Sequence, residues 1–254
     1  LHHALMNHVS PVLDRSMIDD TFACRTGKGS LAAVTRCQHH IRRFDCFSKQ
    51  DVRQYFASIP HEILLEMLHR RFRSEGVCLL LRRIVESHSD APGRGLPIGA
   101  LTSQHFANFY LGLLDRFLLE HSRVRAMVRY MDDFVFWCPD LAETKSAVAA
   151  VREFSEETLQ LSLRDSGEIN SSRQGVTLCG YRIYRGTIRL SASRRKRFRQ
   201  TKAKWEELWL SGKITAKQLQ NGYSAALAIT LHADSLQWRR QGLAANAPAW
   251  YECV

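Results

Sequence analysis

The spacing of apolar residues along the chain alternates between two periods, and each period predicts a different kind of element. Apolar residues three and four positions apart predict amphipathic helices, whereas short apolar runs bounded by turn residues predict strands. Helical spacing predicts helices over 1–20, 31–43, 59–72, 77–88 and 141–160. Short apolar runs predict strands over 47–50 and 161–163 and a hairpin over 176–190. The chain is therefore expected to combine helices with short strands.

A second hairpin is predicted where two apolar runs, 126–129 and 134–137, flank the adjacent acids Asp132 and Asp133. The turn of such a hairpin presents both carboxylates, which repel each other unless a cation lies beside them. Mg²⁺ prefers oxygen ligands of this kind. Asp51, at the end of a short predicted strand, supplies the third carboxylate needed to hold two ions for phosphoryl displacement. A divalent-metal site of these three acids is predicted; an ordinary acidic turn is the alternative.

A long helix is predicted to follow a glycine-bearing segment and to begin near Thr102, a residue suited to the helix cap. Its apolar positions are Phe106, Tyr110, Leu113, Leu114 and Phe117. We expect this helix to be buried and to pack beneath the hairpin that carries the acids.

The composition favours a nucleic acid as the partner. Lys and Arg number 36 against 25 Asp and Glu, which gives a net charge of +11 and a pI near 9.6, so a polyanion is expected. Membrane surface is the rival polyanion, but no apolar run approaches the roughly 20 residues that span a bilayer. The seven cysteines are scattered without metal-ligand spacing, which indicates reduced thiols in a cytosolic protein. His39 and His40 are given no role.

Two segments combine cations with features suited to phosphate binding. Between 22 and 30, glycines permit close approach of the backbone while Arg25 and Lys28 neutralise charge; a surface loop is the alternative. From Ser191 onward, basic helices carry tryptophans and are interrupted at 211–212. Basic helices with aromatic residues suit contact with a phosphate backbone, although tryptophans at this spacing are more often core residues.

The order of these parts resembles a reverse transcriptase over essentially the whole chain, and most closely the reverse transcriptases of diversity-generating retroelements. Four stretches carry the resemblance: 23–29, 49–56, 95–104 and 129–133. The third has Ile98-Gly99 and ends in Ser103-Gln104, where most reverse transcriptases read Gln-Gly and Ser-Pro. The resemblance implies an α+β right-hand polymerase with a ferredoxin-like palm, interleaved fingers and a helical thumb. It assigns 1–190 to fingers and palm and 191–254 to the thumb, and relatives carry a further fingers segment before the position of Leu1.

The resemblance also assigns site residues. It implies that Asp51, Asp132 and Asp133 are catalytic and bind two Mg²⁺ ions, for which Mn²⁺ is a possible substitute. The residues implied to contact the nucleotide are Arg25, Lys28, Phe56, Ile98, Gly99 and Gln104, with Phe56 excluding a ribose 2′-hydroxyl. The implied primer grip is Cys179, Gly180 and Tyr181, and the implied thumb contacts to nucleic acid are Arg194, Arg195 and Arg197. The lysine that relatives carry after the strand at 161–163 is absent, and Arg164 stands near its place.

The activity implied is RNA-directed DNA synthesis on a template RNA, with errors concentrated opposite template adenines. The implied partners are template RNA, the cDNA primer or product, deoxynucleotides and a pentameric accessory protein, in the cytoplasm and encoded by a bacterium or phage. One alternative is a reverse transcriptase of a retron, group II intron or phage-defence system. The other is a polymerase-like scaffold that binds RNA without synthesis.

Overall fold

The computed structural model describes residues 2–121 and 123–245 and divides the chain into two compact units, Leu1–Gln174 and Gly175–Val254. The helices of the first unit are α1 (His2–Ser16), α2 (Ser30–Arg43), α3 (Tyr55–Ser58), α4 (His61–His69), α5 (Glu75–Glu86), α6 (Leu101–Tyr110), α7 (Gly112–Glu120) and α8 (Leu141–Glu157). Its strands are β1 (Cys46–Asp51), β2 (Ala126–Tyr130), β3 (Asp133–Cys138) and β4 (Glu168–Ser171), followed by a 3₁₀ turn at Ser172–Gln174.

The strands of the first unit form one antiparallel sheet in the order β2-β3-β1-β4. Along the chain, helices α3 to α7 lie between β1 and β2, with α6 and α7 last, and α8 connects β3 to β4. This is the βαββαβ arrangement of a ferredoxin-like fold. The arrangement matters for the site because it makes β1, which ends at Asp51, the neighbour of β3, which begins at Asp133.

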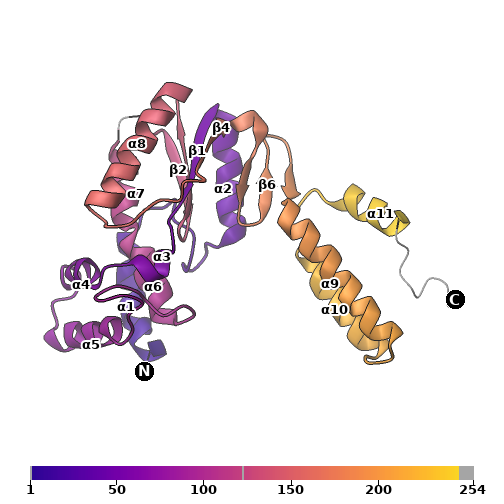
Figure 1. The fold of residues 1–254 in the computed structure, drawn as a ribbon, viewed down its shortest axis with the longest axis horizontal. Coiled ribbons are helices and arrows are strands. Elements are labelled where there is room, and N and C mark those ends of the chain that lie inside the picture. Colours follow the sequence, from indigo (N-terminus) through magenta and orange to yellow (C-terminus); the bar gives the residue numbers. More distant parts are fainter. Residues whose placement is uncertain (1, 122, 246–254) are drawn as a thin grey trace. The chain divides into compact units, whose positions relative to one another are not determined.

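Helices cover both faces of this sheet (Figure 1). Successive side chains of a strand point to opposite faces. Phe134 and Phe136 of β3 belong to the main core, which also includes buried residues of α6, α7 and α8. Trp137, the residue after Phe136, points to the other face and lies beside His40 of α2, with 5.2 Å between the ring centroids. The sheet is therefore buried on two sides, which explains why β3 reads as a continuous apolar run.

The first unit differs from the sequence-based expectations in three places. The single long helix predicted from Thr102 is two helices, because Leu111 has ψ −2° and Gly112, a poor helix former, follows it. The strand predicted at 161–163 is reduced to an isolated bridge between Val52 and Leu163. The fourth strand of the sheet is β4, which the apolar pattern does not reveal because all four of its residues are only half-buried.

The second unit contains a three-stranded antiparallel sheet and three helices. The strands are β5 (Val176–Leu178), β6 (Tyr181–Ile183) and β7 (Ile188–Leu190), and the helices are α9 (Ala192–Leu210), α10 (Ala216–Ala228) and α11 (Leu236–Ala245). The predicted hairpin is therefore a meander with an additional turn at 179–180. Helices α9 and α10 pack closely: a Cβ atom on Gly222 would lie 2.3 Å from the ring of Trp205. Within 2–121 and 123–245, no helix has the length and apolar character of a membrane span.

Candidate active site

The sheet brings the three predicted acids to one end of the β2–β3 hairpin. Asp51 and Asp133 are directly opposite each other in the β1–β3 register, and Tyr130 is opposite Asp133 in the β2–β3 register. Only Met131 and Asp132 therefore form the loop of the hairpin. Met131 has φ +61°, a left-handed conformation that non-glycine residues seldom adopt. The tight turn holds Asp132 next to the two strand-end acids.

Asp132 and Asp133 lie in an environment that disfavours their charges. Burial raises the pKa of Asp132, and the neighbouring Asp51 raises it further. Burial also raises the pKa of Asp133 to about 6; Lys49 opposes this shift, and Asp51 and Asp132 add to it. A cation bound at this strand end would stabilise the charged carboxylates and so lower their raised pKa values.

Two cationic side chains stand beside the acids. Arg164 Nε lies 2.9 Å from Asp51 Oδ2, and Lys49 Nζ lies 3.1 Å from Asp133 Oδ1. Asp133 Oδ1 is buried and forms no hydrogen bond of good geometry within the described part of the chain, so the Lys49 ammonium serves as its charged partner. A buried carboxylate oxygen is costly unless a cation or donor approaches it, as Lys49 does here.

The donor set suits a hard divalent cation. The side chains offer only carboxylate oxygens, the ligand type preferred by Mg²⁺, and one of those oxygens, Asp133 Oδ1, is buried beside the Lys49 ammonium. No three Asp, Glu, His or Cys side chains of 2–121 and 123–245 are gathered closely enough to hold one ion. The three acids therefore share one hairpin end without closing around a single ion. Asp51 and Asp133 are instead each paired to a cationic side chain.

A buried hydrogen-bond network holds the Met131–Asp132 turn from the side of the core. Arg129 donates from Nε and Nη2 to the two carboxylate oxygens of Asp115, each at 2.6 Å. Its Nη1 donates to Asn108 Oδ1 at 2.9 Å and to the carbonyl oxygen of Met131 at 2.8 Å. Thr21 Oγ1 also donates to Asp115 at 2.8 Å. The four residues whose side chains form the network, Arg129, Asp115, Asn108 and Thr21, are all at 0% exposure. Through the carbonyl of Met131, the network joins the core directly to the loop that carries Asp132.

The network is not apparent from the sequence pattern. Arg129 stands there only within the stretch 129–133, and no role is predicted for Asp115 or Asn108. The sequence does carry one signal for the Arg129–Asp115 pair. Arg129 lies within an apolar strand that must be buried, and a buried arginine requires a buried acid as its partner. Asp115 is the acid on the helix predicted to lie beneath that strand.

The two cationic side chains predicted to contact a triphosphate each form an ion pair with an acidic side chain. Arg25 pairs with Asp14 at 2.5 Å and donates to the carbonyl oxygen of Thr21 at 2.9 Å, and its side chain is 9% exposed. Lys28 pairs with Asp19 at 2.5 Å, and Asp19 is 88% exposed. Arg25 therefore fixes the loop from within, whereas the Lys28 pair lies at the surface.

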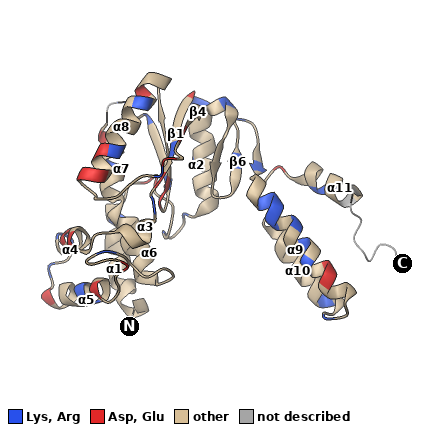
Figure 2. Cartoon of the chain, in the orientation of Figure 1, with Lys and Arg blue, Asp and Glu red and all other residues tan. Residues whose placement is uncertain are grey.

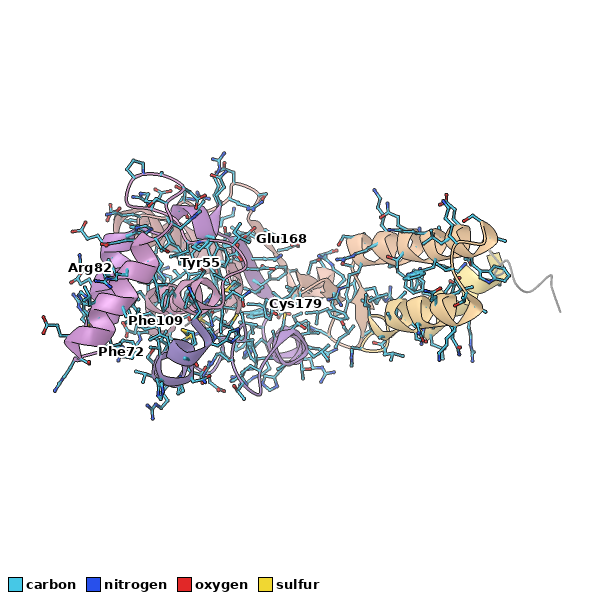
Figure 3. The ribbon with its side chains drawn as sticks, turned by 90° about the horizontal axis from the view of Figure 1, so that it is seen from below. Tyr55, Phe72, Arg82, Phe109, Glu168 and Cys179 are labelled. Atoms are coloured by element: carbon cyan, nitrogen blue, oxygen red, sulfur yellow. The ribbon has the colours of Figure 1, made fainter. Side chains whose placement is uncertain are left out.

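Phe56 is placed next to the segment that carries the altered motif. The backbone N–H of Leu96 donates to the carbonyl oxygen of Phe56 at 2.9 Å. The ring of Phe56 lies 5.8 Å from that of Tyr55, and Tyr55 is buried with its hydroxyl bonded to the carbonyl of Ala107 (Figure 3). Phe56 is half-buried and is thus held from one side with part of its ring accessible.

The altered motif itself is largely exposed. Ile98 is 86% exposed and Gly99 has φ +95°, a conformation suited to glycine. Gln104, near the start of α6, lies 3.7 Å from Cys24 Sγ, which donates to its side-chain oxygen. The structure therefore brings the loop of Arg25 and the segment of Ile98 to adjoining parts of the first unit.

The predicted primer grip is a tight turn in the second unit. Leu178 and Tyr181 are opposite each other, so Cys179 and Gly180 alone form the loop. Both have positive φ, +49° and +77°, as two-residue hairpins of type I′ require. The guanidinium of Arg194 lies 4.3 Å from the ring centroid of Tyr181, and a Cβ atom on Gly180 would lie 2.3 Å from Arg194 Nε.

The predicted thumb cations have different surroundings. Arg194 is half-buried against the turn, whereas Arg195 and Arg197 are exposed on α9. Lysines and arginines crowd the first half of this helix (Figure 2), which has no buried residue. Only Arg195 and Arg197 of the three are therefore fully presented to solvent.

Comparisons with known proteins agree with this fold. The profile of the reverse transcriptase (RNA-dependent DNA polymerase) family matches residues 1–166. A COX1/OXI3 intron 2 protein from Saccharomyces cerevisiae is 27% identical over 101 residues, which cover 37% of this chain and 12% of that protein. The chain thus spans about an eighth of the length of that relative.

Solved structures of telomerases share the fold. Apo telomerase from Candida tropicalis matches with a TM-score of 0.59 and 11% identity over 89% of this chain and 49% of that one. Telomerase from Candida albicans, in complex with a fragment of telomeric RNA, matches with a TM-score of 0.55 and 12% identity over 81% and 42% of the respective chains. These matches confirm the predicted α+β right-hand polymerase fold. Because the family profile covers well over half of the sequence, this chain belongs to the reverse transcriptase family.

Proposed function

We propose that this chain is an RNA-directed DNA polymerase that extends a primer on a template RNA. The observation that carries the proposal is the meeting of Asp51, Asp132 and Asp133 at one hairpin end, with raised pKa values on Asp132 and Asp133. Family membership supports the same activity. Three acids arranged in this way are suited to phosphoryl transfer assisted by divalent ions.

Asp51, Asp132 and Asp133 would hold two Mg²⁺ ions, with Mn²⁺ as a possible substitute. When bound, such ions supply activation of an attacking hydroxyl and stabilisation of the leaving phosphate charge. The carboxylates position charge and do not act as the nucleophile. Arg129 holds the Met131 carbonyl and thereby fixes the loop on which Asp132 stands.

The remaining nucleotide contacts follow from the placement of the side chains. Phe56 would fill the space of a ribose 2′-hydroxyl. Lys28 would reach a triphosphate by exchanging its exposed partner Asp19, a pair at the surface that contributes little stability. Arg25 is too deeply held to exchange easily and would act by shaping the loop.

The second unit would bind the template and primer. Cys179, Gly180 and Tyr181 would contact the primer end, and the cations of α9, including Arg194, Arg195 and Arg197, would face the phosphate backbone. Template RNA, cDNA and deoxynucleotides are the expected partners, in the cytoplasm of a bacterial or phage-infected cell.

We further propose that synthesis is error-prone opposite template adenines and serves a diversity-generating retroelement, together with a pentameric accessory protein. Ile98 supports this because an exposed aliphatic side chain stands where most relatives have an amide. Loss of the amide removes hydrogen bonds that would discriminate correct from incorrect pairs. Gln104 in place of the usual proline supports the same assignment.

The experiment is primer extension on an RNA template with Mg²⁺, comparing the wild type with Asp132→Ala, with and without the accessory protein, followed by sequencing of the products. Synthesis that requires Asp132, with errors concentrated opposite adenine, is the expected result. Ile98→Gln should then raise fidelity at adenine, and an unchanged error spectrum would remove Ile98 from the explanation.

A second candidate is an intron-type reverse transcriptase, favoured by the similarity to the COX1/OXI3 intron 2 protein. Accurate synthesis at adenine would support it. Absence of synthesis in every condition, with RNA binding retained, would instead support a polymerase-like RNA-binding scaffold.

A further inference from the structure

A buried histidine, His61, joins the segment that follows Asp51 to the segment that leads into the altered motif. His61 is the first residue of α4 and is buried. Its ring Nε2 lies 2.7 Å from the carbonyl oxygen of Gly95. Because a carbonyl oxygen only accepts, Nε2 carries a proton and donates it. His61 therefore forms a side-chain hydrogen bond between two segments that are 34 residues apart in the chain.

The same two segments also pair through their backbones. The N–H of Leu96 donates to the carbonyl of Phe56 at 2.9 Å, and the N–H of Gly95 donates to the carbonyl of Ile59 at 3.0 Å. Leu96 is buried and lies two residues before Ile98. The residue predicted to exclude a 2′-hydroxyl and the start of the altered motif are therefore held at a fixed separation.

Arg94 ties this loop to a third segment of the chain. Its Nη1 donates to the carbonyls of Ser58 and Gln160, each at 3.0 Å, and its Nη2 donates to Gln160 Oε1 at 2.6 Å. Gly95, the next residue, has φ +107°, and a Cβ atom there would lie 2.4 Å from Asp90 Oδ2. Since only glycine suits this tight fold, the carbonyl of Gly95 has a defined position.

The hydrogen bond of His61 lies beside a cavity of about 1000 Å³, which His61 and Arg94 both line. Water from this cavity can approach the carbonyl of Gly95 once the imidazole is removed, so that oxygen is not left without a partner. The hydrogen bond therefore contributes more to the relative position of the two segments than to the stability of the fold.

We propose that His61 is a positioning residue that sets the selectivity of the nucleotide site for deoxyribose, because it keeps Phe56 and the segment of Ile98 at a fixed separation. This inference rests on the proposed polymerase function, in which both of these residues contact the same nucleotide. Exclusion of a 2′-hydroxyl requires that the ring of Phe56 cannot retreat. A displacement of about 1 Å is enough to change a rate by about a hundredfold, so a looser junction loses selectivity before it loses the fold.

The kinetic test compares kcat/KM for a deoxynucleotide with kcat/KM for the matching ribonucleotide, in single-nucleotide primer extension on an RNA template. His61→Leu removes the donor and keeps an apolar side chain. It is expected to lower the deoxy-to-ribo ratio about tenfold, the factor that loss of one hydrogen bond gives. His61→Gln, whose amide donates from a similar position, is expected to restore most of the ratio. Arg94→Met, at a half-buried position, is expected to lower the ratio as well and serves as the second test if His61→Leu does not fold.

Hydrogen exchange followed by mass spectrometry tests the anchoring on the full chain without nucleotide. The amides of Gly95 and Leu96 donate to the other segment and are expected to exchange about tenfold faster in His61→Leu. In His61→Gln they are expected to exchange at nearly the wild-type rate. His69→Leu is the matched control, because His69 is an exposed histidine at the end of the same helix, and it should change neither the exchange nor the ratio. Thermal unfolding verifies that each variant is folded.

Unchanged exchange at 95–96 in His61→Leu, or equally fast exchange in His61→Gln, would overturn the anchoring role. Faster exchange with an equal fall in kcat/KM for both nucleotides would overturn the selectivity role, because the ratio would then be unchanged. A wild type that makes no DNA, with faster exchange in His61→Leu alone, would refute the polymerase function while leaving the anchoring role of His61 intact.

Discussion

Two hairpin turns in this molecule are built alike and held differently. The Met131–Asp132 turn and the Cys179–Gly180 turn each have two residues, and each begins with a non-glycine residue in a left-handed conformation, at φ +61° and +49°. Each is also contacted by one arginine. Arg129 is wholly buried and bonds the first turn through its Met131 carbonyl, whereas Arg194 is half-buried and stacks on Tyr181 beside the second.

Because Arg129 is buried and Arg194 lies near solvent, removing each arginine is expected to change stability by a different amount. Removing Arg129 would leave the carboxylate of Asp115 buried without its cationic partner, which is among the most destabilising changes in a protein. Removing Arg194 would leave no buried charge, only a lost cation–π contact near solvent. The position of Asp132 therefore depends on the stability of the core, whereas the Cys179–Gly180 turn can be altered without unfolding the unit.

The largest expected effect is that of Arg129→Met. We expect it to lower the free energy of unfolding by about 3–5 kcal/mol, because the charge of Asp115 becomes unpaired in the core. Urea unfolding followed by circular dichroism measures this. The double variant Arg129→Met/Asp115→Leu should recover most of the stability, since both charges are then absent.

The double variant also separates support of the turn from stability. The hydrogen bond to the Met131 carbonyl is still missing, so primer extension should remain reduced although the protein is folded. Full activity in the double variant would mean that the loop of Asp132 needs no tether from Arg129, and the contrast between the two turns would then concern stability alone.

A second prediction concerns the opposite face of the first hairpin, where His40 packs on Trp137. Burial lowers the pKa of His40 from 6.5 to about 4. The unfolded chain takes up this proton near pH 6.5 and the folded chain only near pH 4, so stability is full above pH 6.5 and falls as the pH drops toward 4. The loss from this group is at most about 3 kcal/mol.

The measurement is the free energy of unfolding from pH 7 to 4 for the wild type and His40→Phe. The variant removes the titrating group and two ring nitrogens that have no hydrogen-bond partner among the described residues, so its stability should vary less with pH. Asp133 acts in the opposite direction, because its raised pKa makes the folded chain hold the proton more tightly. The difference between the two proteins isolates His40, and parallel curves would show that its burial is not maintained in solution.

Gly180→Ala is expected to have a smaller effect. A φ of +77° is strained for alanine, by about 1 kcal/mol, and the new Cβ would displace Arg194 from its position beside the turn. Stability should fall by roughly that amount, while KM for the primer–template rises more than kcat falls. Gly186→Ala is the control and should change neither strongly, because φ of Gly186 is not positive and a Cβ atom there would meet nothing within 4 Å.

The apolar pattern of the sequence predicts the main elements of the first unit, but not the side-chain contacts that hold these elements in place. The hairpin, the helix beneath it and the strand of Asp51 follow from apolar periodicity, because these elements are buried. The break at Leu111 and the half-buried β4 do not, since neither interrupts the apolar pattern. The pairing of Arg129 with Asp115, and of Arg25 with Asp14, joins residues distant in the chain, and such partners are set by tertiary packing that periodicity does not encode.

The smallest expected effect on stability concerns Arg194 and Arg197, two arginines that lie three positions apart on α9. Arg194→Ala should lower stability by about 0.5–1 kcal/mol through loss of the contact with Tyr181. It should also raise KM for the primer–template, because the turn loses its support. Arg197→Ala, on an exposed neighbour, should leave stability unchanged and reduce the slope of log affinity for RNA–DNA duplex against log salt by about one.

These two outcomes distinguish support of a turn from contact with phosphate. Arg194→Lys keeps the charge but loses the planar stack and its fit against Gly180. A lysine at 194 that preserves the salt slope and still raises KM would assign Arg194 to the turn, as Arg129 is assigned to the other. If Arg194→Ala and Arg197→Ala instead change the salt slope equally and leave stability alone, Arg194 is a phosphate contact like its neighbour, and only the buried turn is held by an arginine.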